Sequence, residues 1–138
     1  MKIMLDKGAK MPTRAHETDA GLDLYSRETT IVSAKESAVF DTGVHIELPP
    51  DTVGYIKGKS GLNVKYGIVV PDGTVDEGYT GSIRVKLYNL SGYDYKVSKG
   101  DKICQLVIHP ILKPELEVVD SLADTERGSG GFGSTGKN

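Results

Sequence analysis

Short runs in which apolar and polar residues alternate recur along the chain, and turn-forming residues separate them. The clearest run is Ile83-Arg84-Val85-Lys86-Leu87-Tyr88, whose period of two predicts a strand with one packed face and one solvated face. The pattern predicts strands over residues 2–5, 22–25, 29–33, 38–41, 44–48, 53–57, 68–70, 82–88, 93–97, 102–108 and 116–119. Because many short strands follow one another, we expect an all-β fold, a jelly-roll-like barrel or sandwich.

No segment shows a long helical period, and residues 60–66 are the one stretch where we expect a short helix. Its start at Ser60-Gly61 would present free backbone N–H groups to an anion. The chain has 138 residues, which is long enough for one domain with a real core but not for two.

Composition narrows the classes of partner. The chain carries 17 basic and 19 acidic residues, so no global field favours nucleic acid, and any binding of anions must come from a local site. No apolar run is long enough to span a membrane, and the sequence starts directly on a strand-like pattern with no signal sequence. We therefore expect a cytoplasmic protein, with a nuclear or viral context as the open alternative. Cys104 lies in an apolar stretch and is expected to be a buried structural thiol. His16, His45 and His109 are too scattered to predict a transition-metal cluster.

The glycine-rich segment 127–138 combines groups that can grip a nucleotide. Glycines let backbone N–H groups approach phosphate oxygens, Arg127 supplies a planar cation, Phe132 offers a face for a base, and Ser134 and Thr135 add hydroxyl donors. A disordered terminus is the alternative. Since a plain linker has no use for an Arg and a Phe, we predict a β-domain over 1–126 and a flexible lid over 127–138.

Two further segments suggest a site for phosphate and metal. Asp23 lies within a predicted strand, where a carboxylate is disfavoured unless a site needs it, although an edge-strand Asp in solvent is equally compatible. Gly58-Lys59-Ser60-Gly61 can present a cation, a hydroxyl and backbone donors to phosphate, and an ordinary turn is the alternative.

The segment 72–81 and Gln105 complete the set. Glycines and turn residues crowd around Asp76 and Tyr79, which suggests that the backbone itself approaches a ligand. An Asp there can orient and deprotonate a water, and a Tyr ring can pack flat on a sugar. Gln105 places an uncharged amide among apolar neighbours, where a core glutamine with local partners is the alternative.

Taken in order, these five segments resemble the five signature motifs of the homotrimeric deoxyuridine triphosphatases (dUTPases). The resemblance implies a jelly-roll homotrimer with exchange of C-terminal arms and three active sites at subunit boundaries. It also implies Mg²⁺-dependent hydrolysis of dUTP to dUMP and pyrophosphate by attack of water on the α-phosphorus. That reaction limits uracil incorporation into DNA and supplies dUMP for dTMP synthesis. No nucleic-acid or membrane partner is implied.

Residue roles follow from the same resemblance. Asp23 would anchor hydrated Mg²⁺ through water, and Ser60 and Gln105 would contact the α- and β-phosphates. Asp76 would hold the nucleophilic water and the sugar 3′-hydroxyl, with Tyr79 packed beneath the deoxyribose. Main-chain groups of 68–76 would read uracil and leave no room for the thymine methyl. The tail, reaching over from another subunit, would place Phe132 over uracil and Arg127, Ser134 and Thr135 around the γ-phosphate. Further substrate contacts are implied for Lys59, Gly61, Gly73, Thr74, Val75 and Gly133.

The sequence departs from the family pattern at two places, and two alternatives stay open. Lys59 stands where the family commonly has Arg, and Lys cannot make a bidentate phosphate contact. Pro71-Asp72-Gly73 lacks the Asn that some members use to bind the base. One alternative is dCTP deaminase, whose catalytic Glu would align with Lys86 and which lacks the glycine tail. The other is a regulatory binding protein that shares the fold.

Overall fold

The computed structural model describes residues 1–131, and in that part the chain is almost entirely β. The elements in chain order are β1 (Lys2–Leu5), β2 (Leu22–Tyr25), β3 (Thr30–Val32), β4 (Ser37–Asp41), β5 (Val44–Glu47), β6 (Thr52–Lys57), α1 (Ser60–Tyr66), β7 (Ile68–Val69), β8 (Gly73–Val75), β9 (Arg84–Asn89), β10 (Tyr95–Val97) and β11 (Lys102–Pro110). No described helix is long and apolar enough to cross a membrane.

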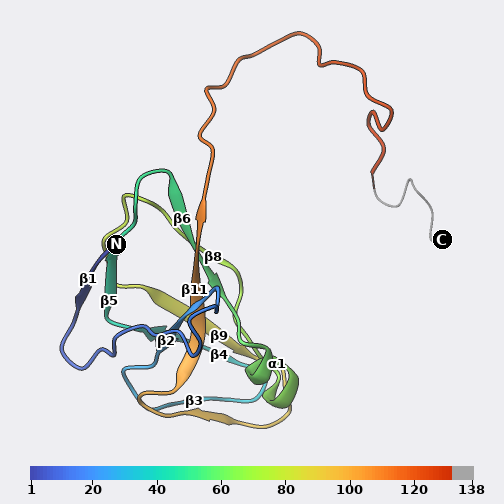
Figure 1. The fold of residues 1–138 in the computed structure, drawn as a ribbon. Coiled ribbons are helices and arrows are strands. Elements are labelled where there is room, and N and C mark those ends of the chain that lie inside the picture. The colour runs from blue at the N-terminus through green and yellow to red at the C-terminus, as the bar shows by residue number, and fades with distance from the viewer. Residues whose placement is uncertain (132–138) are drawn as a thin grey trace.

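The strands form four antiparallel sheets that wrap one core. The largest has the order β2-β11-β6-β8, the next β4-β9-β7, and β1-β5 and β10-β3 form two-stranded ribbons at the sides. Neighbours in these sheets are far apart in sequence, and β11 runs through the middle of the body between β2 and β6 (Figure 1). This arrangement confirms the expected all-β jelly-roll class.

The core is filled by the inward residues of the alternating strands. In β9 the pattern is strict, because Val85 and Leu87 are buried while Arg84 and Lys86 are exposed. Cys104 is fully buried in the same core, and burial raises its pKa to about 12. A thiol with so high a pKa is uncharged and inert at neutral pH, which confirms the structural role expected for it.

Most of the predicted elements are observed. β1 and β2 have the predicted bounds, the other confirmed strands differ by one or two residues at an end, and the predicted helix forms over Ser60–Tyr66. Gly67 ends that helix in the left-handed conformation with φ of 65°, which glycine adopts without strain.

Two element predictions need correction. Residues 116–119 are not a strand, because no described strand pairs with them, and Leu116 and Val118 are 94% and 99% exposed. Conversely, β8 was not predicted, because Asp72-Gly73 is a turn signal. Pairing of Gly73 with Ile56 of β6 nevertheless extends this segment into the sheet.

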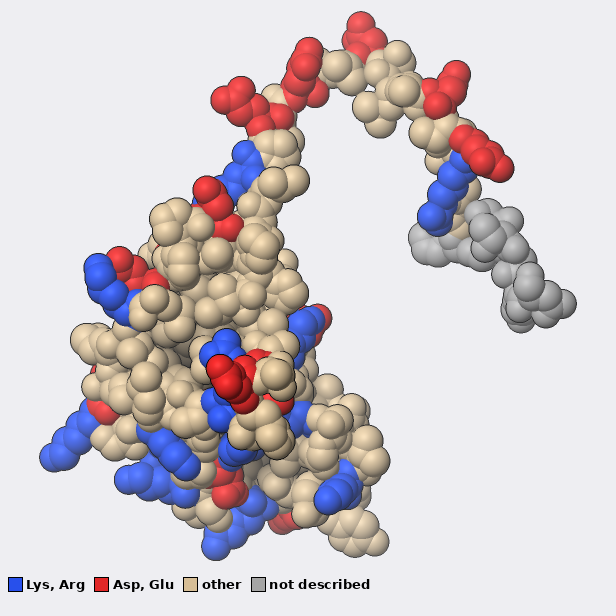
Figure 2. Space-filling model, viewed as in Figure 1, with Lys and Arg blue, Asp and Glu red and all other residues tan. Residues whose placement is uncertain are grey.

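Beyond β11 the chain leaves the body as a long extended segment (Figure 1). Its exposed acidic side chains follow one another along the arc, whereas basic and acidic residues mix on the body (Figure 2). A segment that leaves apolar residues such as Leu112, Leu116 and Val118 in solvent has surface available for contact with another protein surface.

Candidate active site

A pocket of about 220 Å³ lies where β8 runs into the following turn. Its lining brings together five residues that the sequence singled out, Gly73, Thr74, Val75, Asp76 and Tyr79. Three more lining residues were not foreseen, Ile56, Ile83 and Arg84. The alternating pattern of the neighbouring strands predicts which residues face the core, but it does not predict which of them line a pocket. We call this hollow the β8 pocket.

Close backbone packing shapes the β8 pocket. A Cβ added at Gly73 would lie 3.3 Å from the Ile56 Cβ, so a side chain there would push β8 away from β6. The turn is closed by the Tyr79 N–H, which donates to the Asp76 carbonyl at 3.0 Å. The Tyr79 hydroxyl donates to the Ser82 carbonyl at 2.8 Å, and its ring lies over Gly81, where an added Cβ would be 2.6 Å from the hydroxyl oxygen. Gly81 is thus a site residue that sequence reasoning included only as a turn glycine.

Asp23 is a buried carboxylate held between two ammonium groups. It is 6% exposed on β2, with Lys59 Nζ 2.5 Å from one oxygen and Lys102 Nζ 2.7 Å from the other. Burial raises the pKa of Asp23, but hydrogen bonds from Lys102 and Lys59 and their charges outweigh burial and hold that pKa below its ordinary value. The alternative of an edge-strand Asp in solvent is therefore wrong.

Lys102 was not predicted as a site residue. Its position depends on the register of β11 against β2, which shifts between Lys102 and Cys104. Such a shift brings the Lys102 side chain to Asp23, and no local pattern in the sequence reveals it.

Gln105 lies next to Asp23 in the same sheet. Its backbone pairs with Asp23 on one side and with Lys57 on the other, and its amide nitrogen donates to the Gly58 carbonyl at 3.1 Å. A Cβ added at Gly21 would be 2.2 Å from the Gln105 amide oxygen, so only glycine lets this side chain lie where it does. Gln105 is half-buried and has the local partner that a structural glutamine would have.

The motif Gly58-Lys59-Ser60-Gly61 leads from β6 into α1. Lys59 is the N-cap residue and makes no side-chain capping bond, and its carbonyl accepts from the N–H groups of Leu62 and Asn63. Gly58, Lys59 and Ser60 line a second hollow of about 340 Å³ together with Asn63 and residues 68–70, which we call the α1 pocket. A cation, a hydroxyl and the start of a helix around one hollow suit an anion.

Within residues 1–131, no residue lines both the β8 pocket and the α1 pocket. Asp23, Gln105 and the Gly58–Gly61 motif are joined by direct contacts, whereas Asp76 and Tyr79 belong to the other hollow. The residues predicted for one site therefore fall into two groups on a single chain.

The tail residues are the third part of the prediction. Arg127 is exposed, and its Nε donates to the Gly130 carbonyl at 3.0 Å. The extended segment after β11 runs away from the strands (Figure 1). In this single chain Arg127 lines neither pocket. The predicted residues Phe132, Gly133, Ser134 and Thr135 lie outside the described residues.

Comparisons with known proteins agree on one family. The dUTPase family model matches residues 7–136. A deoxyuridine 5′-triphosphate nucleotidohydrolase of Clostridium acetobutylicum is 48% identical over 96% of this chain and 92% of its own, and one of Kluyveromyces lactis is 42% identical over 100% and 95%. The chain belongs to the dUTPase family.

Solved structures give the same result. The dUTPase of Staphylococcus bacteriophage 80alpha with dUPNHPP superimposes with a TM-score of 0.93 at 34% identity, covering 99% of this chain and 98% of that chain. A mutant dUTPase of phage phi11 of S. aureus, solved to describe a structural Mg(II) ion, has a TM-score of 0.82 at 32% identity, covering 87% and 96%. The dUTPase resemblance and the enzyme class that it implied are thus confirmed, and neither alternative is favoured.

Proposed function

We propose that this chain, a dUTP hydrolase by family, cleaves dUTP to dUMP and pyrophosphate with a water held by Asp76 attacking the α-phosphorus. The observation that carries the proposal is the β8 pocket, where an exposed carboxylate and a tyrosine ring lie within one hollow lined by strand backbone. A carboxylate so placed can accept the proton of the attacking water. Taking up that proton as the oxygen–phosphorus bond forms makes the water a better nucleophile.

The β8 pocket suits the nucleoside part of the substrate. Its volume of about 220 Å³ is below the roughly 300–1,000 Å³ typical of pockets for drug-sized ligands, so the triphosphate must extend beyond it. We infer that Gly73, Thr74 and Val75 read uracil with main-chain groups and that Tyr79 lies beneath the deoxyribose. The tight packing of Gly73 on Ile56 supports rejection of a 5-methyl group, because β8 cannot shift toward β6.

The α1 pocket and its neighbours suit the phosphates. We assign phosphate contacts to Lys59, Ser60, Gly61 and Gln105, supported by their grouping around the start of α1 and the end of β6. Lys102 joins this group as a second cation. With the Asp23 carboxylate between them, the two lysines leave one net positive charge beside the triphosphate, and each acts as a point charge.

Mg²⁺ is the proposed cofactor. This ion prefers oxygen ligands, keeps several waters, and is bound through one or two carboxylates plus substrate phosphates. Asp23 would hold the ion through water, because it is a buried carboxylate beside the residues assigned to the phosphates, and a water of the ion would take the place of one of the two lysines that now pair with it. When bound, the ion supplies neutralisation of phosphate charge.

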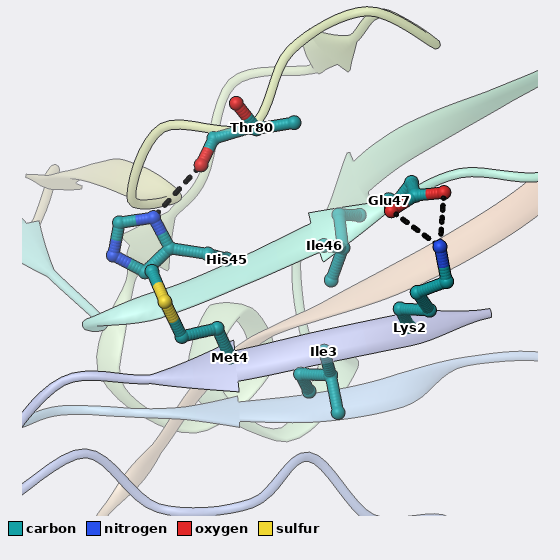
Figure 3. A pocket seen from close by; sticks show the side chains of 7 residues that line it. All are labelled: Lys2, Ile3, Met4, His45, Ile46, Glu47 and Thr80. Carbon is teal, nitrogen blue, oxygen red and sulfur yellow. Dashed lines mark hydrogen bonds and ion pairs between the residues drawn. The ribbon is translucent and has the colours of Figure 1, made fainter.

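We propose a homotrimer with exchanged C-terminal arms and sites at subunit boundaries. The separation of the β8 and α1 pockets supports this, because a neighbouring subunit is needed to bring the two groups together. The exposed alternating residues 116–119 support an arm that pairs outside its own chain. The ribbon β1-β5 offers an apolar hollow of about 200 Å³ beside β1, lined by Ile3, Met4, His45, Ile46 and others (Figure 3).

The segment 127–138 is proposed to be the lid of a site on another subunit. Arg127, Ser134 and Thr135 would surround the γ-phosphate, Gly133 would approach it, and Phe132 would cover uracil. The long exposed stretch between β11 and Arg127 supports a reach beyond the chain's own body. Closure over a site excludes water, which strengthens the contacts inside.

A substrate panel tests the proposal. The protein is incubated with dUTP, dCTP, dTTP or UTP and Mg²⁺, and pyrophosphate and ammonia are followed. We expect pyrophosphate from dUTP alone at an appreciable rate, because a steric clash or an unpaired group can reduce a rate by several powers of ten. Comparable rates with dTTP or UTP would contradict the roles of Gly73 and Tyr79, and release of ammonia from dCTP would restore the deaminase alternative.

A further inference from the structure

His45 lines the hollow beside β1 and bonds to two other parts of the chain. It stands on β5 with its side chain 18% exposed, and its Nδ1 is 2.8 Å from the Thr80 carbonyl oxygen. Its Nε2 is 3.2 Å from a carboxylate oxygen of Asp6, in the loop after β1. Figure 3 shows the imidazole reaching from β5 to the loop that carries Thr80.

Both ring nitrogens of His45 face acceptors. A neutral imidazole has one N–H and can donate only one of these bonds, whereas the protonated ring donates both. The charged groups around the ring are Asp6, the carboxylate in contact with it, and Arg27 and Asp41, which lie beyond Asp6. Lys2 and Glu47, which line the hollow beside β1 together with His45, are paired with each other.

Hydrogen bonds that start at Asp6 also reach the loop of residues 80–82 by a second route. The other oxygen of Asp6 accepts from Arg27 at 3.1 Å, and Arg27 donates to Asp41 at 3.0 Å. Asp41 in turn accepts a hydrogen bond from the Ser82 hydroxyl. The loop is thus tied to β4 and β5 on both sides of Gly81, at Thr80 through His45 and at Ser82 through Asp41.

The tied segment is the support of Tyr79. The Tyr79 hydroxyl donates to the Ser82 carbonyl, and the ring lies over Gly81. Movement of residues 80–82 therefore moves the ring that lines the β8 pocket.

We propose that His45 is a positioning residue of the nucleoside site, whose bond to Thr80 fixes the Tyr79 ring and so sets the affinity for dUTP and its selection over UTP. The inference rests on the proposed use of Tyr79 beneath the sugar. His45 does not line the β8 pocket, so it would act through the loop and not by contact with substrate. Its effect is expected in KM and in sugar selection, with the chemical step left intact.

Two near-isosteric variants separate the two bonds of the ring. His45→Asn carries an amide nitrogen at the reach of Nδ1 and keeps a donor for Thr80, whereas His45→Gln carries one at the reach of Nε2 and keeps a donor for Asp6.

Loss of one hydrogen bond typically changes an equilibrium by about three- to tenfold. We expect His45→Gln to raise KM for dUTP by that factor with kcat within twofold of the wild type, and to narrow the dUTP to UTP ratio. His45→Asn should restore KM to within twofold. The exposed His16, changed to Ala, is the matched control and should alter neither constant.

Hydrogen exchange provides a readout that does not need turnover. Backbone amides of residues 76–82 should exchange faster in His45→Gln than in the wild type or in His45→Asn. Equal KM and equal exchange for the two variants would overturn the proposal, as would a loss confined to kcat. A wild type that does not hydrolyse dUTP would defeat the proposed function, while the exchange measurement would still decide whether His45 holds the loop. Should either variant fail to fold, Ser82→Ala, which removes the tie to Asp41 and leaves His45 in place, is compared with the wild type. Unchanged exchange of residues 76–82 would support His45 as the group that holds the loop, and complete loss of their protection would overturn the proposal.

Discussion

The side chains of the two key aspartates differ most in what surrounds them. Asp23 is buried between Lys59 and Lys102, and both of its oxygens are engaged. Asp76 is exposed in the β8 pocket, where it can meet a water and a sugar hydroxyl. The first environment suits a fixed negative charge beside phosphates, and the second suits a base that takes up a proton in each turnover.

Changing Asp76 to Asn tests its role as the base. The amide keeps the shape of the side chain and a hydrogen bond, but it cannot take a proton from water. We expect kcat to fall by roughly a hundredfold to ten-thousandfold, while dUTP still binds with similar affinity. Steady-state kinetics and titration calorimetry with a non-hydrolysed analogue measure the two effects. A variant that keeps most of its kcat would show that another group activates the water.

Gly81 tests the placement of the Tyr79 ring. A Cβ at residue 81 would come within 2.6 Å of the Tyr79 hydroxyl oxygen, so Gly81→Ala must displace the ring. We expect KM for dUTP to rise about tenfold and the preference for dUTP over UTP to shrink, because loss of ring and hydrogen-bond contacts has this magnitude. Gly78→Ala is the control, since no atom lies within 4 Å of the added Cβ. Equal constants for the two variants would contradict the placement.

At the scale of elements, alternation predicted the strands well because one packed face leaves a period-two pattern, as in β9. β8 escaped prediction, since its extended form comes from pairing with β6 and its own residues are typical of a turn. Residues 116–119 carry a strand pattern without a partner in the described chain.

For the candidate site too, the sequence predicted residues that share a local motif and missed those that depend on long-range contacts. Asp76 and Tyr79 stand in one local motif that the structure keeps together in one pocket. Lys102 depends on a register shift in β11, and His45 depends on contacts between segments 35 or more residues apart. Contacts of that kind arise from tertiary packing and leave no local signal.

The hydrogen bond between Ser82 and Asp41 of β4 predicts that the stability of the fold depends on pH. The Ser82 hydroxyl, the Gly43 N–H and Arg27 hold the pKa of Asp41 below its ordinary value. A carboxyl with a lowered folded-state pKa stabilises the fold above its unfolded pKa, and this contribution is lost as pH falls through the folded pKa. Asp41→Asn should therefore be less stable than the wild type at neutral pH, and the gap should narrow at about pH 3.

Urea unfolding at the two pH values measures that gap. Glu117→Gln, a change on the exposed extended segment, serves as the control and should behave as the wild type at both. A gap that stays constant or widens in acid would mean that the Asp41 carboxylate does not contribute through its charge.

At the scale of the whole molecule, one described chain holds the parts of the proposed active site in two separate pockets. Asp76 lies in the β8 pocket, and Lys59 and Ser60, which we assign to the phosphates, line the α1 pocket. The extended segment after β11 runs away from the strands (Figure 1). A closed ring of identical subunits joins such parts, because every interface then repeats the same pairing. The central claim is that each working site takes Asp76 and the lid from different subunits.

Mixing two inactive chains tests this claim most directly. Deletion of residues 127–138 removes the lid and should leave a folded assembly with a steep loss of kcat, because the segment offers little apolar surface for burial. Asp76→Asn keeps the lid and lacks the base. When the two chains are refolded together in equal amounts, about one quarter of the sites should combine an intact Asp76 from one subunit with an intact lid from another. The account predicts dUTP hydrolysis at about a quarter of the wild-type rate. A mixture no more active than its two parents would show that the tail serves its own subunit, and the exchanged-lid arrangement would be wrong.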